Sequence, residues 1–204
     1  HTKSDGLLQS IADDIGEKSK SSVFYSLAFL YQTNGPITAA IKNVTKNNKI
    51  FVYGISDRKV GGLDFQDPDG NVAPVFSSAL SKNLPEPFKS EPAGGAGNRK
   101  HHKFVVLDLD KPSARVYLGS YNFSEPAETK NGENLLLIRN RRIAVSYVVE
   151  AVRIFDHYHF RVIQQQASKT KHKLVLLKPP RNPGEKAWWE EDYVVPRKIR
   201  DREL

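Results

Sequence analysis

The sequence predicts an α/β fold in which a mixed β-sheet is flanked by helices. Two features of the 204-residue chain carry this prediction. Segments with helical spacing of apolar residues alternate with short apolar runs of strand length, and three short strands later follow one another closely with polar residues at or near their ends. We expect one domain over residues 1–162, followed by a basic C-terminal extension over residues 163–204.

The N-terminal part of the chain predicts a βαβ unit. Apolar residues spaced three and four apart between Leu7 and Ile15 predict a first amphipathic helix, and residues 22–30 form a largely apolar run of strand length. A second helix is expected to begin at Pro36, because proline is favoured in the first turn and apolar residues then recur at helical spacing. Residues 50–55 complete the unit as a buried strand.

The middle of the chain is expected to be irregular, and the second half to return to strands and a helix. Residues 56–100 contain many Gly, Pro, Asp, Asn and Ser residues, which indicates long excursions. Three predicted strands follow: an apolar run within His101–Asp108, then Arg115–Leu118, then Leu135–Ile138. A stripe of apolar residues from Ala144 to Val162 predicts a helix that covers the sheet.

The most informative stretch is an H-x-K-x4-D pattern from His101 to Asp108, which is followed by G-S-x-N at Gly119–Asn122. Alternate residues of a strand share a face, so His101 and Lys103 are expected with Cα atoms roughly 7 Å apart, where both can contact one phosphate. Asp108 has the opposite parity, and we interpret it as structural. Imidazole, ammonium, hydroxyl and carboxamide groups at strand ends point to phosphodiester chemistry.

These residues closely resemble the signature of the phospholipase D superfamily. The match is tight from His101 to Asn134 and extends by pattern over residues 7–162. The resemblance implies a phospholipase D-like lobe, in which a motif histidine attacks phosphorus to form a phosphohistidine. The spacer from Asp108 to Gly119 is longer than is usual in the family, and we interpret the excess, at Lys111–Ser113, as a lengthened hairpin loop.

The resemblance also implies a role for each motif residue. His101 would be the nucleophile or the general acid, and Glu133 the carboxylate that orients it. Lys103 and Asn122 would hold phosphate oxygens. The implied site therefore consists of the catalytic residues His101, Lys103, Asp108 and Glu133, with Asp108 included only as a motif member, and the phosphate-binding residues Lys103, Ser120 and Asn122.

The chemistry of these groups requires no metal or other cofactor, but it requires two histidines. A neutral imidazole can attack an anionic phosphodiester while Lys103 and amide donors stabilise the phosphoryl oxygens, and a protonated imidazole must serve the leaving group. A second H-x-K occurs at His1–Lys3, but position 8 is Leu and no G-S-x-N follows. We therefore expect the second histidine from another copy of the chain or from a lobe that is absent here.

Charge and composition leave the substrate open. The chain carries a net charge of +8, and residues 161–204 contain eleven basic and six acidic residues. Such a segment attracts nucleic acid and anionic phospholipid alike. The chain has no cysteine, and no apolar stretch is long enough to span a membrane. The alternative function is a non-catalytic lobe or polyanion-binding fragment of a larger two-lobe protein.

Overall fold

The computed structural model describes residues 6–30, 35–57, 62–66, 68, 72–76, 101–169 and 178–204. Its strands form one seven-stranded sheet in the order β4-β3-β2-β1-β5-β6-β7. The strands are β1 (Ser22–Leu27), β2 (Phe51–Asp57), β3 (Gly62–Gln66), β4 (Val72–Phe76), β5 (Lys103–Leu107), β6 (Arg115–Gly119) and β7 (Leu135–Ile138). The helices are α1 (Leu7–Gly16), α2 (Pro36–Thr45), α3 (Glu125–Thr129), α4 (Arg141–Lys169), α5 (Glu191–Val194) and α6 (Pro196–Glu203).

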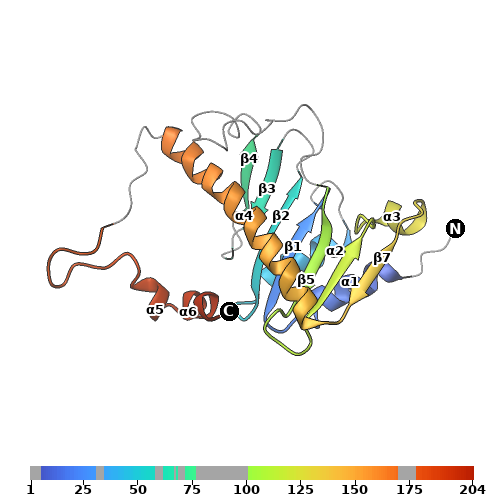
Figure 1. Ribbon diagram of the computed structural model, residues 1–204, viewed down its shortest axis with the longest axis horizontal. Helices are drawn as coiled ribbons and strands as arrows, with labels where there is room; N and C mark the ends of the chain where they lie inside the picture. The colour runs from blue at the N-terminus through green and yellow to red at the C-terminus, as the bar shows by residue number, and fades with distance from the viewer. Residues whose placement is uncertain are drawn as a thin grey trace.

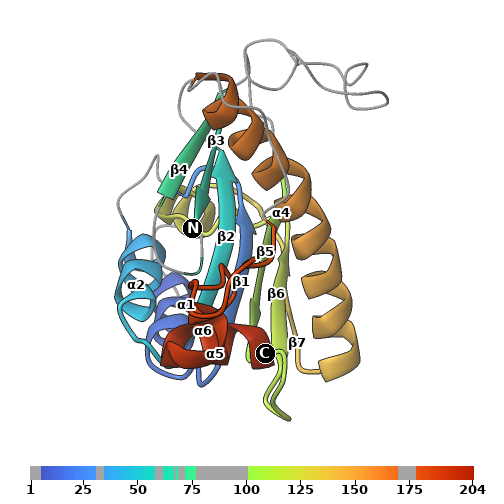
Figure 2. The same ribbon diagram turned by 90° about the vertical axis from the view of Figure 1, so that its left-hand side faces the viewer.

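The sheet is mixed and has helices on both faces, which confirms the predicted fold class. β1 and β2 are parallel and joined through α2, whereas the other neighbouring strands are antiparallel. α1 and α2 cover one face and α4 crosses the other (Figures 1 and 2). One apolar core lies under α1 and α2 and contains Tyr25 and Val105, and a second lies under α4 and contains Phe104 and Phe155.

The expectation of long excursions over residues 56–100 is wrong for two segments. β3 and β4 extend the sheet beyond β2 as an antiparallel pair. β4 contains Pro74, and its position at the edge of the sheet explains why a residue without a backbone N–H is tolerated there. The remainder of the predicted excursion, residues 77–100, lies outside the described residues.

The predicted covering helix is longer than its apolar stripe, and the C-terminal extension contains two further helices. α4 continues through the domain boundary expected at residue 162 and ends at Lys169. α6 lies beside the start of β2: Arg200 donates a hydrogen bond to the backbone oxygen of Asn48 and its guanidinium lies 6.0 Å from the centre of the Phe51 ring. Among the described helices, none is long and apolar enough to cross a membrane.

Candidate active site

The register of the sheet brings all the motif residues except Asp108 to one edge. Lys103, the first residue of β5, pairs with Leu27, the last residue of β1. Because Phe104 pairs with Leu118, the start of β5 also lies beside the end of β6. Gly119, at the end of β6, then pairs with the start of β7. Segments around residues 101, 120 and 133 therefore meet at this edge of the sheet.

His101 precedes the strand instead of lying on it. β5 begins at Lys103, and both His101 and His102 are exposed. The Lys103 ammonium donates a hydrogen bond of 3.0 Å to the backbone oxygen of His101, which joins the two residues without using the imidazole. No described residue hydrogen-bonds to the ring of His101, so the imidazole remains accessible to a ligand.

Lys103 is a buried cation that experiences the negative charge of two carboxylates. Its exposed fraction is 7 %. Burial lowers the pKa of Lys103 below its ordinary value, and the negative charges of Glu133 and Asp57 oppose this effect. Asp57, the last residue of β2, is itself buried. Sequence reasoning did not identify Asp57, although its position two residues after the predicted buried strand at residues 50–55 was a usable signal.

Glu133 holds Asn122 through two hydrogen bonds. The backbone N–H of Asn122 donates to Oε2 of Glu133 at 2.7 Å, and Nδ2 of Asn122 donates to Oε1 at 2.8 Å. Asn131 donates a third hydrogen bond to this carboxylate at 3.0 Å. These contacts orient the Asn122 amide and leave its second N–H for a ligand oxygen. The role of Glu133 in orienting His101 stays a prediction, because the described contacts of its carboxylate are with the two asparagines.

Ser120 lies at the exposed start of the same turn. Its backbone N–H donates to Oδ1 of Asn134 at 3.1 Å, and its Oγ accepts a hydrogen bond from the backbone N–H of Asn134 at 2.9 Å. The Ser120 hydroxyl hydrogen is therefore still available to a phosphate oxygen.

A pocket of about 480 Å³ lies next to these groups, and Tyr121, Glu128 and Glu133 are among its lining residues. Tyr121 is almost fully buried. Burial and the nearby carboxylates of Glu128 and Glu133 raise the pKa of Tyr121 to about 12, so its hydroxyl is protonated at neutral pH. The pocket is lined by both acidic and basic side chains, since Lys130 contributes to it as well, and it adjoins the site through Glu133.

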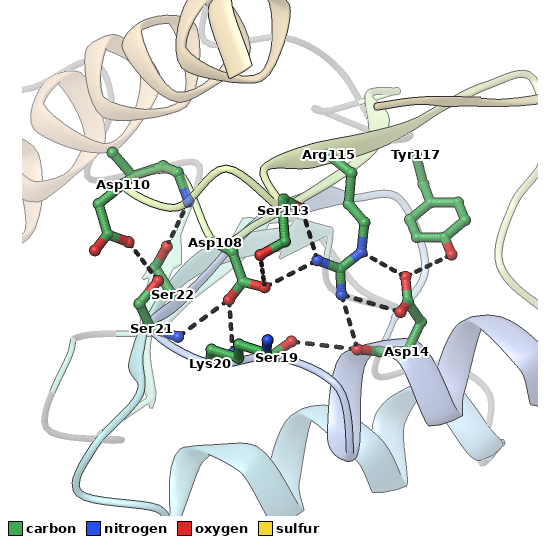
Figure 3. A network of polar contacts seen from close by, with 11 residues as sticks. Asp14, Ser19, Lys20, Ser21, Ser22, Asp108, Asp110, Ser113, Arg115 and Tyr117 are labelled. Atoms are coloured by element: carbon green, nitrogen blue, oxygen red, sulfur yellow. Dashed lines mark hydrogen bonds and ion pairs between the residues drawn. The ribbon is translucent and has the colours of Figure 1, made fainter. Parts of the chain in front are cut away.

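Asp108 lies at the opposite end of β5, roughly 16 Å along the strand from Lys103. Its buried carboxylate accepts hydrogen bonds from the backbone N–H groups of Lys20 and Ser21 at 2.6 and 3.0 Å, and from Arg115 at 2.9 Å (Figure 3). Asp108 therefore joins the β5–β6 loop to the segment before β1, which agrees with its interpretation as a structural residue.

Arg115 links Asp108 to a second carboxylate, that of Asp14 on α1 (Figure 3). Tyr117 donates a further hydrogen bond to Asp14 at 2.7 Å. Burial opposes ionisation of Asp14, but the hydrogen bonds from Arg115 and Tyr117 outweigh it and lower the pKa of Asp14 below its ordinary value. The network fixes α1 on the sheet, and no short-range pattern in the sequence pairs residues about 100 positions apart.

Within the described part of the chain, no group of three or more His, Cys, Asp or Glu side chains is arranged to hold a metal ion.

Comparison with known proteins agrees with the motif. Residues 12–156 match the family model described as "Cardiolipin synthase, PLD-like domain". A phospholipase D of Rickettsia prowazekii (strain Madrid E) is 40 % identical over 48 residues, which are 24 % of this chain and 22 % of that protein. A phospholipase D of Rickettsia felis is 38 % identical over 48 residues, with the same shares. The match thus spans about a fifth of the length of these relatives.

Two solved structures are also among the similar proteins. NucT from Helicobacter pylori is 21 % identical with a TM-score of 0.47, over 74 % of this chain and 89 % of that chain. Nuc from Salmonella typhimurium, a phospholipase D family member, is 20 % identical with a TM-score of 0.44, over 73 % of this chain and 87 % of that chain.

Proposed function

Since this chain belongs to the phospholipase D-like (PLD-like) domain family, we propose that it cleaves or transfers phosphodiesters through a phosphohistidine formed on His101. The observation that carries the proposal is the meeting of an accessible imidazole, a buried ammonium and an oriented carboxamide at one edge of the sheet, on His101, Lys103 and Asn122. Each of these groups suits a different part of a phosphodiester.

In the proposed first step, the neutral imidazole of His101 attacks phosphorus and the bond from phosphorus to the leaving oxygen breaks. The Lys103 ammonium, the Ser120 hydroxyl and the second N–H of Asn122 stabilise the negative charge on the phosphoryl oxygens. A second histidine gives its proton to the leaving oxygen. Water or an alcohol then attacks the phosphohistidine, passes its proton to that second histidine, and releases the imidazole of His101.

The second histidine is proposed to come from another copy of this chain or from a further lobe. Anionic phospholipids and nucleic acids both remain proposed substrates, because the groups at the site address the phosphate that the two classes share.

A generic aryl substrate tests the proposal. We expect the chain to hydrolyse bis(p-nitrophenyl) phosphate in excess chelator, and His101→Ala to abolish turnover. His102→Ala is a matched control, since it removes the neighbouring exposed imidazole and should retain activity. Equal turnover in His101→Ala and the native chain would contradict the proposal, as would complete loss in chelator that a divalent ion restores. A monomer in solution without turnover would favour a missing second lobe.

A further inference from the structure

Asn134 holds the turn that follows β6. The backbone and side chain of Asn134 make three hydrogen bonds to Ser120 and Tyr121. Asn134 Oδ1 accepts from the Ser120 N–H at 3.1 Å, Asn134 N–H donates to Ser120 Oγ at 2.9 Å, and the Asn134 carbonyl accepts from the Tyr121 N–H at 3.0 Å. Only the first of these bonds depends on the side chain of Asn134.

We propose that Asn134 is a positioning residue for the phosphate donors of this turn, an inference that rests on the proposed function. Its Oδ1 accepts the hydrogen bond of the Ser120 backbone N–H, and its own backbone N–H donates to one lone pair of the Ser120 hydroxyl oxygen. The donor that Ser120 offers to a phosphate is therefore its O–H, polarised by the hydrogen bond that its oxygen accepts.

The neighbouring residues make the arrangement specific. Glu133 binds the backbone and side chain of Asn122, so Glu133 and Asn134 together fix both donors of the G-S-x-N segment. Gly119 has a φ of 149°, and a Cβ there would lie 2.4 Å from the backbone oxygen and 2.7 Å from Oδ1 of Asn134. The two segments are in contact at a distance that only glycine permits.

A double-mutant cycle tests the role. Asn134→Ala should lower kcat for bis(p-nitrophenyl) phosphate about tenfold with little change in KM, since a displaced donor loses most of its effect in the transition state. Asn134→Asp keeps an oxygen acceptor of the same shape but adds a negative charge beside the proposed phosphate, so it should restore the hydrogen bond to the Ser120 N–H and only part of kcat. In a Ser120→Ala background, Asn134→Ala should lower kcat little further, because the hydroxyl that Asn134 positions is already absent.

Asn47 provides the matched control. Its Oδ1 accepts the Lys49 N–H at 3.0 Å in an exposed turn before β2, at the other end of the sheet. Asn47→Ala should leave kcat unchanged. Native kcat in Asn134→Ala, or multiplicative losses in the Ser120→Ala background, would overturn the inference while the proposed function stands.

Amide hydrogen exchange tests the role of Asn134 independently of whether the proposed function is correct. In the native chain, the Ser120 amide should exchange slowly for an exposed residue, and Asn134→Ala should accelerate its exchange several-fold without affecting residues of β1. This result is expected even if the native chain does not turn over the substrate. Unchanged exchange at Ser120 would overturn the inference by itself.

Discussion

Lys103 and Asp108 belong to one sequence motif, yet they lie at opposite ends of β5 and have different surroundings. Lys103 meets the accessible edge of the sheet, where Glu133 and Asp57 supply negative charge. Asp108 is enclosed by backbone N–H groups and Arg115. The same motif thus contains Lys103, which is suited to binding phosphate, and Asp108, which is suited to stabilising the fold.

Substitutions should distinguish the residues that bind phosphate, which affect turnover, from Asp108, which affects stability. Lys103→Ala and Asn122→Ala are expected to lower turnover roughly a hundredfold or more, as the loss of an oxyanion donor does. Asp108→Asn should instead lower the free energy of unfolding by about 3 kcal/mol, because it leaves Arg115 buried without that carboxylate. Turnover and urea unfolding measured on all three variants check this. Equal catalytic losses with native stability in every variant would contradict the division.

The pH dependence of activity should report the protonation of Lys103. The proposed mechanism needs the ammonium form, and burial lowers the pKa of Lys103 below its ordinary value of 10.5. Activity towards bis(p-nitrophenyl) phosphate, whose p-nitrophenolate leaves without needing a proton from the second histidine, should therefore be present at neutral pH and be lost as the pH rises through a value below 10.5. Asp57→Asn removes a negative charge that favours the ammonium, so it should shift this loss to still lower pH.

A profile of kcat/KM against pH measures both effects. Asp156→Asn is the control, because this exposed carboxylate lies on α4. An alkaline limb that does not move in Asp57→Asn would show that Asp57 does not act on Lys103.

At the scale of the element, the connection between β6 and β7 carries the residues that are proposed to bind phosphate. α3 and its flanking loops separate the two strands in sequence, yet Gly119 pairs directly with Leu135. Glu128 of α3 also accepts a hydrogen bond from the backbone N–H of Leu8 at the start of α1, at 3.1 Å. The short helix is thereby held against α1, and the loop that carries Glu133 is held with it.

Two glycines of this connection should respond differently to alanine. Gly119→Ala places a methyl group against Asn134 at an unfavourable φ, so we expect turnover to fall at least tenfold and stability to drop by about 1–3 kcal/mol. Gly132→Ala adds a methyl group with no atom within 4 Å and should change neither quantity appreciably. Urea unfolding and turnover distinguish the two variants, and native behaviour of Gly119→Ala would show that the segments do not approach so closely.

At the scale of the whole molecule, the chain carries one proposed set of phosphate-binding residues and one histidine in the H-x-K-x4-D context. Attack and protonation of the leaving group need two positioned imidazoles. We propose that two lobes face each other across an approximate two-fold axis, each contributing His101 and Lys103 or their equivalents to one phosphate.

Mixing of subunits tests this arrangement in a homodimer. When His101→Ala chains are exchanged into active protein, activity should fall more steeply than the fraction of active chains, because mixed dimers keep one catalytic histidine. The measurement is turnover against mixing ratio after subunit exchange, with the mass in solution recorded alongside. A linear decline would show that each chain works alone, and no activity at any ratio would point to an absent lobe.

The sequence by itself determined the elements with strong local patterns and the identity of the motif residues. Helical spacing between Leu7 and Ile15 predicted α1, and the βαβ unit was found where expected. Apart from Asp108, the residues of H-x-K-x4-D and G-S-x-N are ones that the sheet brings to one edge. These signals are local, because side-chain periodicity and motif spacing are set by neighbouring residues along one strand or helix.

Only the tertiary structure decided which distant groups meet. Strand order and register placed Asp57 near Lys103, joined Asn134 to Ser120, and carried Asp108 to the far end of β5 beside Arg115. The strands β3 and β4 were not predicted, because their local sequence patterns are weak. The strands are stabilised by pairing, β3 with β2 and β4 with β3. Such pairings depend on the packing of the whole sheet, which no short stretch of sequence specifies.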